Sequence, residues 1–308
     1  MRYALLCLIS AAPLLHATTY YVTIAGLGGT PEFETQFSKW ASETDRALHA
    51  SDPSAHVDTL SGAQATRSHV QSELARLASE MKPDDAFALM LIGHGTYDDT
   101  DYKFNLPGPD ITGAELVSLL DRIPTKHQLV VNMTSASGAS LAALAHKDRI
   151  VITATKSGNE KNVTLFARYW IEALRDPEAD TNKNGVVSAL EAYRYAERKT
   201  AQFYESEKRI ATEHAMLDDN GASDGARDPS PANGEGMLAA SFAVVRYGGA
   251  QSAALAPGKQ QLLHKKEDLE AQIDRLKYQK AALPEDEYKK QLTALLLDLA
   301  RTQAELDK

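Results

Sequence analysis

Up to about residue 245, segments with two different hydrophobic patterns follow each other along the chain. Short runs that are continuously apolar, or rich in β-branched and aromatic residues, predict buried strands. Between them, apolar residues recur every three or four positions, which predicts amphipathic helices. Strands that alternate with helices favour an α/β fold, a mainly parallel sheet with helices on both faces. The predicted strands are 20–25, 56–60, 86–92, 129–133 and 150–154, with a last strand within 237–245.

The helical segments fit between these strands. Thr112 is placed to cap one helix, and Pro83 lies just beyond the end of another. The predicted helices carry their apolar positions within 33–48, 70–81, 116–123, 140–145, 163–174 and 189–207.

A different pattern begins after residue 247. Leu262, Leu269, Leu276 and Leu283 repeat every seven residues, and Pro284 followed by three acidic residues marks the start of another helix. We therefore expect a C-terminal helical hairpin, a coiled coil, over 259–308. It packs on itself, on the core or on a second copy of the chain. Residues 248–258 are rich in Gly, Ala and Ser and are expected to be a linker.

The N-terminus has the pattern of an export signal. Arg2 precedes a short apolar stretch that ends near Ala17, a small residue suited to cleavage. Residues 1–17 are thus a predicted signal peptide, and 18–247 the main domain of a periplasmic or secreted protein. Cys7 is the single cysteine, so the mature chain would have no thiol. Thiol catalysis and disulfides are then excluded.

Net charge and hydropathy limit the classes of partner that we expect for this protein. The net charge of −9 disfavours nucleic acid as a ligand. No segment after the signal is apolar and long enough to span a membrane.

Two predicted strands end in residues suited to chemistry. One runs into Gly93-His94-Gly95, and the next core strand runs into a turn that contains Ser135 and ends in Ser137-Gly138. Adjacent parallel strands would bring both turns to one edge of the sheet. A histidine beside a nucleophile is the minimum for acyl transfer, and the Gly95 N–H can hold an oxyanion.

The order and spacing of these turns resemble caspases, legumains and their bacterial relatives, over roughly residues 20–245. The resemblance implies that His94 is the catalytic histidine and Gly95 the oxyanion glycine. It places Ser135 where the family has its cysteine. It also implies that the loop after the 150–154 strand, with Ser157, Gly158, Asn159 and Glu160, lines the pocket for a peptide substrate.

Serine at the nucleophile position leaves three hypotheses. A hydroxyl needs far stronger base activation than a thiolate, so the first is a degenerate peptidase that binds a peptide or protein segment. The second is an active hydrolase in which Ser135 attacks and His94 is the base. The third is a scaffold protein that acts through the 259–308 hairpin.

Residues 180–191 match the calcium-binding loop of an EF-hand. The predicted ligands are Asp180, Asn182, Asn184, the Val186 carbonyl, Ser188 and Glu191, and Gly185 stands at the sharp turn. Only two ligands are charged, which predicts a weak structural Ca²⁺ site, with Kd about 10⁻⁴–10⁻³ M. Ser188 and Glu191 also match a helix capping box, and both interpretations can hold together. A second acidic stretch, 213–225, lacks a full loop's spacing. It is expected to be a turn, and a second ion site is the alternative.

Overall fold

The computed structural model describes residues 18–230, 233–256, 258–280 and 283–308. The predicted signal peptide and Cys7 lie outside the described residues. The centre of the fold is a six-stranded sheet in the order β10-β8-β7-β3-β1-β2. Five of its strands are parallel, and β10 alone runs antiparallel, beside β8. The six strands are β1 (Thr19–Ala25), β2 (His56–Leu60), β3 (Ala86–Ile92), β7 (His127–Asn132), β8 (Arg149–Thr153) and β10 (Met216–Asp218).

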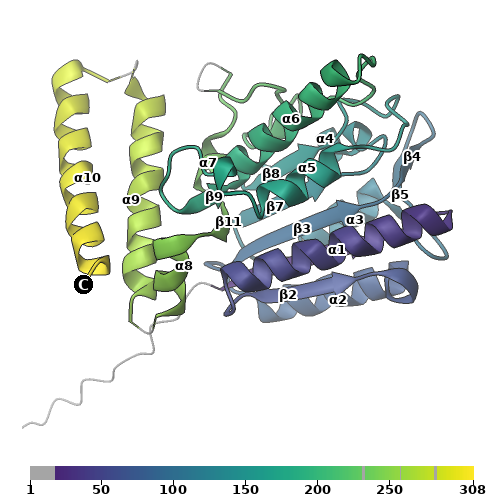
Figure 1. Ribbon diagram of the computed structural model, residues 1–308, viewed down its shortest axis with the longest axis horizontal. Coiled ribbons are helices and arrows are strands. Elements are labelled where there is room, and N and C mark those ends of the chain that lie inside the picture. The colour runs from purple at the N-terminus through teal and green to yellow at the C-terminus, as the bar shows by residue number, and fades with distance from the viewer. Residues whose placement is uncertain (1–17, 231–232, 257, 281–282) are drawn as a thin grey trace, which may run out of the picture.

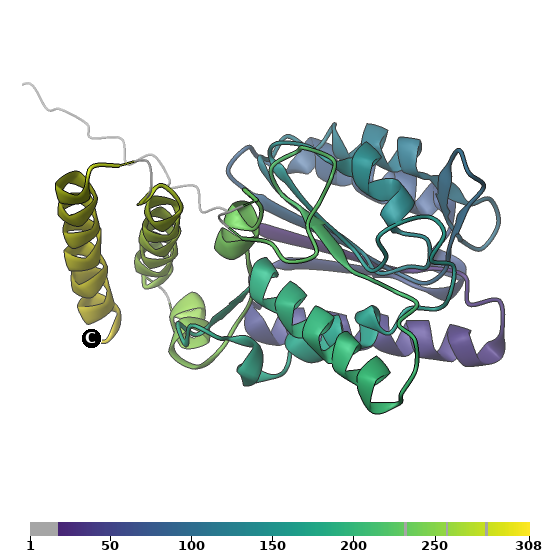
Figure 2. The ribbon, with the colours of Figure 1, turned by 90° about the horizontal axis from the view of Figure 1, so that it is seen from above.

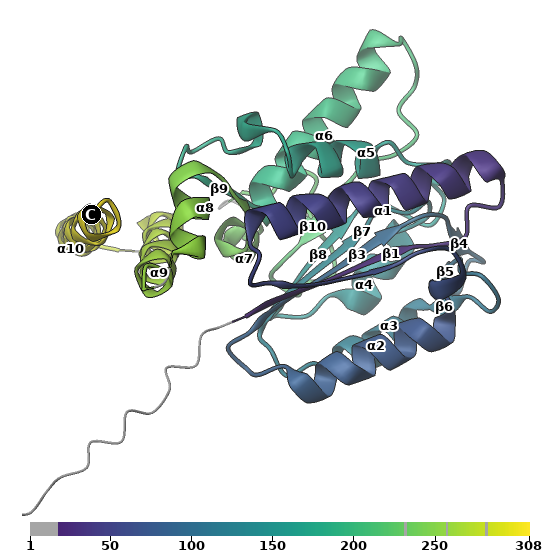
Figure 3. The same ribbon diagram turned by 60° about the horizontal axis from the view of Figure 1, so that its bottom comes forward.

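Helices cover both faces of this sheet (Figures 1 and 3). One face carries α1 (Pro31–Ser51), α5 (Phe166–Ala173) and α6 (Ala189–Ser206), and the other carries α2 (Arg67–Glu80), α3 (Gly113–Leu120) and α4 (Gly138–Leu144). Side chains alternate along β1: Tyr21 packs with the first set and Val22 with the second. The expected α/β class with a mainly parallel sheet is confirmed.

Local sequence explains several helix starts. The Thr30 and Thr66 side chains accept hydrogen bonds from backbone N–H groups in the first turns of α1 and α2. Thr112 and Glu115 form a full capping box at the start of α3. Each cap satisfies backbone donors that the helix leaves unpaired. Two short 3₁₀ helices, Gly62–Gln64 and Pro177–Ala179, complete the connections.

Two small sheets were not predicted. Strands β4 (Gly95–Tyr97), β5 (Tyr102–Phe104) and β6 (Ile111–Thr112) form an antiparallel flap directly after His94. Strands β9 (Val186–Ser188) and β11 (Ala243–Arg246) pair with each other, so the second half of the predicted ion loop is part of a sheet.

The strand predicted within 237–245 is only half right. Residues Met237–Ser241 form the short helix α7, and β11 begins at Ala243. The Asp219 carboxylate accepts hydrogen bonds from the N–H groups of Gly236 and Ala239, which starts the helical turn. The apolar pattern of this segment fits a helix or a strand. Asp219, which lies 17 residues before Gly236, therefore decides that the segment begins as a helix.

The segment expected as a linker is also helical. Residues Gly248–Leu255 form α8, in which Ala250, Ala253 and Ala254 are buried. Alanine is the best helix former, which outweighs the two glycines at the start.

The last two helices, α9 (Gln260–Tyr278) and α10 (Glu285–Leu306), lie side by side at one end of the molecule (Figures 1 and 2). Leu269, Ile273 and Leu276 are buried, as the seven-residue pattern predicts. Their coiled-coil geometry stays a prediction. In the described part of the chain, no helix combines the length and apolar character needed to span a membrane.

Candidate active site

The structure brings the two predicted turns to one edge of the sheet. Strands β3 and β7 are parallel neighbours, and Leu91 pairs with Asn132. His94 and Ser135 each lie three residues beyond this pair, at the carboxyl ends of their strands. The placement expected from the strand pattern is therefore present.

The Ser135 hydroxyl is buried and bonded to the backbone of Gly95. Its Oγ accepts a hydrogen bond from the Gly95 N–H at 3.1 Å and donates one to the Gly95 carbonyl at 3.0 Å. The residue is only 3% exposed. The N–H group expected to hold an oxyanion thus binds the serine hydroxyl itself.

Position 95 has room only for glycine. A Cβ atom there would lie 2.4 Å from the Ser135 carbonyl oxygen and 2.6 Å from both Thr134 Oγ1 and the Tyr102 ring. This close approach is what lets the backbone of Gly95 reach the serine hydroxyl.

His94 is half-buried and points elsewhere. Its Nε2 lies 3.2 Å from the Gly28 carbonyl, and its ring meets the edges of Phe33 and Phe37 at centroid distances of 5.1 Å. A carbonyl only accepts, so this bond places the proton of the neutral ring on Nε2. Burial lowers the pKa of His94, and the bond to Gly28 opposes that shift in part. The structure describes both His94 and Ser135, and their side chains form no hydrogen bond with each other.

The segment that follows β8 holds the turn that carries Ser135. Ala136 has a φ of +56°, a left-handed conformation that costs an L-residue about 1–2 kcal/mol. Its N–H donates to the Glu160 carbonyl at 2.8 Å. The Gly138 N–H donates to Thr155 Oγ1 at 2.8 Å, and the Thr155 N–H donates to Ser137 Oγ at 3.1 Å. The predicted substrate loop therefore fixes the predicted nucleophile turn.

The loop 157–160 packs against the flap that follows His94. A Cβ atom on Gly158 would lie 2.1 Å from the Tyr97 ring, so the two are in close contact. Asn159 is exposed and Ser157 half-buried. The Glu160 side chain binds inward, to the Lys156 N–H and to both the N–H and the ring of His214.

Sequence reasoning missed a buried polar network under the turn. The Tyr102 hydroxyl meets Thr134 Oγ1 at 2.7 Å and Asn132 Oδ1 at 3.2 Å, and the Asn132 amide donates to Ser140 Oγ at 3.0 Å. Burial raises the pKa of Tyr102 well above its usual value, so the phenol stays protonated and can donate. Only the polar Asn132 at the end of an apolar strand hinted at this network in the sequence.

The loop 180–191 adopts a chain of side chain to backbone turns. The Asp180 carboxylate accepts from the N–H groups of Asn184 (3.2 Å) and Gly185 (3.0 Å). Asn182 Oδ1 accepts from the Asn184 N–H, and Asn184 Oδ1 accepts from the Val186 N–H, both at 2.9 Å. Gly185 has a φ of +86°, which favours glycine at the sharp turn.

Glu191 joins the two ends of this loop. Its Oε1 accepts from Thr181 and Asn182, and its Oε2 from the N–H and hydroxyl of Ser188. The Glu191 N–H donates to Ser188 Oγ, so the predicted capping box is present at the start of α6. The oxygens of Asp180 and Glu191 are thus already bonded to the chain.

Among the residues that the structure describes, no group of three or more His, Cys, Asp or Glu side chains could hold a metal ion. The loop 180–191 contributes only two such side chains, Asp180 and Glu191, and its other predicted ligands are amide, hydroxyl and carbonyl oxygens. In the stretch 213–225, the Asp218 carboxylate accepts from the N–H groups of Gly221 and Ser223, as in an ordinary turn.

No protein-family model matches the sequence, and no curated protein matches it either. The solved structures that follow a similar chain path include the following two. One is protein GSU0716 from Geobacter sulfurreducens, with a TM-score of 0.45 and 14% identity, covering 71% of this chain and 96% of that one. The other is the Drosophila initiator caspase Dronc, with a TM-score of 0.43 and 11% identity, covering 67% of this chain and 80% of that one.

Proposed function

We propose that this chain is an exported pseudopeptidase of the caspase/legumain type, which binds a peptide or protein segment and carries a structural Ca²⁺ site. The fold is consistent with a caspase-like sheet. The observation that carries the proposal is the Ser135 hydroxyl, which bonds in both directions to Gly95.

This arrangement opposes serine catalysis in two ways. A nucleophilic hydroxyl gives its proton to a base, whereas Ser135 donates to the Gly95 carbonyl and not to His94. An oxyanion needs a free donor, whereas the Gly95 N–H is already bonded to Ser135 Oγ. Both bonds would have to break before acylation could begin.

Labelling with a serine-directed fluorophosphonate tests the inactive state. We expect the protein lacking residues 1–17 to be labelled no more than its Ser135→Ala variant, because the hydroxyl is buried and not activated. Labelling of the wild type that disappears in both Ser135→Ala and His94→Ala would overturn the proposal in favour of an active serine hydrolase.

Peptide binding beside Ser135 is tested by hydrogen exchange with a tryptic digest of casein as the probe. We expect slower exchange in 156–160 and in the flap 95–104, which lie beside Ser135. Protection confined to α9 and α10 would instead support a scaffold that acts through its C-terminal hairpin.

The donor set of the loop suits Ca²⁺, a hard cation that takes six to eight oxygen ligands. Asp180, Asn182, Asn184, the Val186 carbonyl, Ser188 and Glu191 would hold it, and the ion would link the loop to the start of α6. The carboxylates already accept N–H bonds, which leaves fewer of their lone pairs for an ion. This shared use of the oxygens fits a weak site.

Thermal melting tests this site. With a Kd of about 10⁻⁴–10⁻³ M, 10 mM Ca²⁺ should stabilise the protein by about 1.4–2.7 kcal/mol, on the order of 3–10 °C in Tm. The shift should be lost in Glu191→Gln, which keeps an acceptor for Ser188, and should be smaller with Mg²⁺. An equal Tm in Ca²⁺ and in chelator would contradict the proposal.

A further inference from the structure

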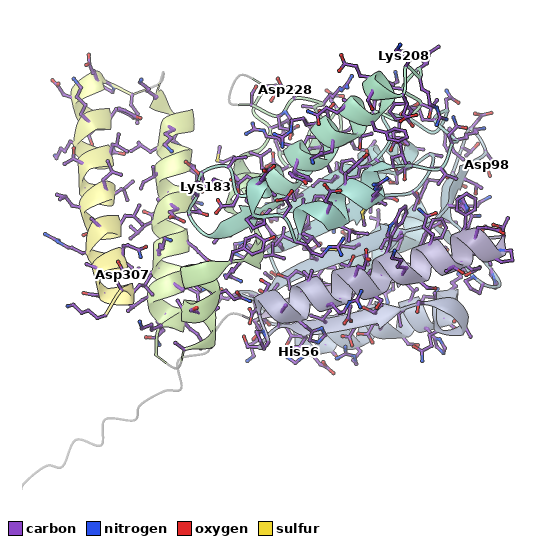
Figure 4. The ribbon with its side chains drawn as sticks, viewed as in Figure 1. His56, Asp98, Lys183, Lys208, Asp228 and Asp307 are labelled. Atoms are coloured by element: carbon purple, nitrogen blue, oxygen red, sulfur yellow. The ribbon has the colours of Figure 1, made fainter. Side chains whose placement is uncertain are left out.

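We infer that the C-terminal helical pair and the loop 180–191 form one coupled unit, in which Glu270 of α9 positions Asn184 as an ion ligand. The inference rests on the proposed Ca²⁺ site and adds the element that sets its affinity. In Figures 1 and 4 the loop that carries Lys183 reaches α9.

The first contact fixes the amide of Asn184. Its Nδ2 donates to Glu270 Oε2 at 3.1 Å, while its Oδ1 accepts from the Val186 N–H at 2.9 Å. An amide has one accepting end and one donating end. The bond to Glu270 therefore keeps the oxygen, the end that can bind a cation, on the loop side.

A second contact holds the same residue by its backbone. Lys266 Nζ donates to the Asn184 carbonyl at 3.0 Å and lies 3.8 Å from Glu270. Lys266 and Glu270 are one turn apart on α9, so a single helix face grips both the side chain and the main chain of Asn184.

The third contact is apolar and joins the loop to both helices. Val186, whose carbonyl is a predicted ligand, is buried in one cluster with Leu263 of α9 and Leu306 of α10. Ala250 and Ala253 of α8 belong to the same cluster. Displacing the hairpin would expose Val186 and loosen two neighbouring ligand positions together.

Beside these contacts, the loop and α9 both line a cavity of about 270 Å³. Asn182, Ser188 and Glu191 line it from the loop, and Glu267, Glu270 and Asp274 line it from α9. Each of these three acids has a cationic partner: Arg246 for Glu267, Lys266 for Glu270 and Lys277 for Asp274. With these charges balanced, we infer that α9 favours the ion by positioning ligands rather than by adding negative charge.

Coupling of this kind is reciprocal. A docked hairpin orders Asn184 before the ion arrives, so less conformational freedom is lost on binding. The bound ion in turn stabilises the docked hairpin by the same free energy. Asn184 and Glu270 are 86 residues apart in the sequence, so the fold, and not a local motif, brings them together.

Calorimetric titration of Ca²⁺ into the full chain tests the inference. We expect Glu270→Ala to weaken binding at least about fivefold, the lower end of ordinary coupling between sites. Glu270→Gln keeps an acceptor for Asn184 Nδ2 and should bind close to wild type. Asp268→Ala removes an exposed acid from the same helix and serves as the matched control.

A second readout follows hairpin docking directly. Ca²⁺ should slow trypsin cleavage at Lys259 in the wild type, and should slow it less in Glu270→Ala. If the wild type does not bind Ca²⁺, the proposed ion site fails. If the wild type binds but Glu270→Ala binds equally well, or if Glu270→Gln is as weak as Glu270→Ala, the positioning role fails while the ion site stands.

Discussion

At Ser135, one hydroxyl oxygen makes two hydrogen bonds to the same residue. A hydroxyl oxygen is a strong donor and a strong acceptor, whereas a thiol is weak in both roles. Ser135 uses both capacities on Gly95. These two bonds fasten the flap strand β4 to the turn after β7.

His94 should make stability depend on pH. Its pKa is lowered by burial, so the unfolded chain takes up a proton more readily than the folded protein. The stabilisation is therefore present above the unfolded value, near about 6.5, and is lost as pH falls below it. We expect the Tm of wild type to fall more steeply from pH 7 to pH 5 than that of His94→Gln.

The glutamine variant keeps a donor for the Gly28 carbonyl and has no proton to take up in this range. His214 and the other histidines are the same in both proteins, so they cancel in the comparison. A difference in Tm between the two proteins that stays constant across this pH range would contradict the assignment of the proton-linked effect to His94.

Among the helices, α5 depends on a residue far away in the sequence. No side chain of its own first turn caps it. The Glu213 carboxylate does so instead, accepting from the N–H groups of Leu165 (2.8 Å) and Phe166 (3.0 Å) and from the Tyr204 hydroxyl (3.0 Å). Glu213 is only 4% exposed. If its carboxylate were removed, little water could reach these donors to accept their hydrogen bonds.

Glu213→Ala should lower the free energy of unfolding by about 1–3 kcal/mol, because buried N–H groups lose their acceptor. Urea unfolding followed by tryptophan fluorescence, from Trp40 in α1 and Trp170 in α5, measures the loss. Glu205→Ala, which removes an exposed acid from the neighbouring helix α6, is the control. A loss in Glu213→Ala no larger than in this control would show that α5 does not depend on the cap.

The same dependence on distant partners limits what the sequence predicts. Strand β3 has the predicted bounds because its apolar run suits a buried strand. The edge strand β2, which has no buried residue, also has the predicted bounds. The predicted helix 163–174 begins instead at Phe166, where Glu213 caps it. At the site, local strand ends predicted that His94 and Ser135 share one edge. The bonds of their side chains, to Gly28 and Gly95, depend on packing that no local pattern encodes.

For the molecule as a whole, Arg246 is a buried charged contact between the core and the hairpin. It ends β11 and is only 6% exposed. Its guanidinium binds Glu267 of α9 through two bonds, at 2.7 and 3.0 Å, and lies 3.8 Å from Asp52 at the end of α1. Its N–H donates to Ser51 Oγ at 2.7 Å. Arg246 thus joins the small β9–β11 sheet to α1 and α9.

Glu267→Ala should leave the Arg246 cation buried without its main partner. We expect a loss of about 3 kcal/mol, the lower end for breaking a buried pair, because Asp52 remains nearby. Arg246→Met combined with Glu267→Leu removes both charges and should recover most of that loss. Urea unfolding reports the energies, and trypsin cleavage at Lys259 reports hairpin docking. If Glu267→Ala changes stability by less than about 0.5 kcal/mol, as a surface substitution does, the pair does not hold the hairpin to the core.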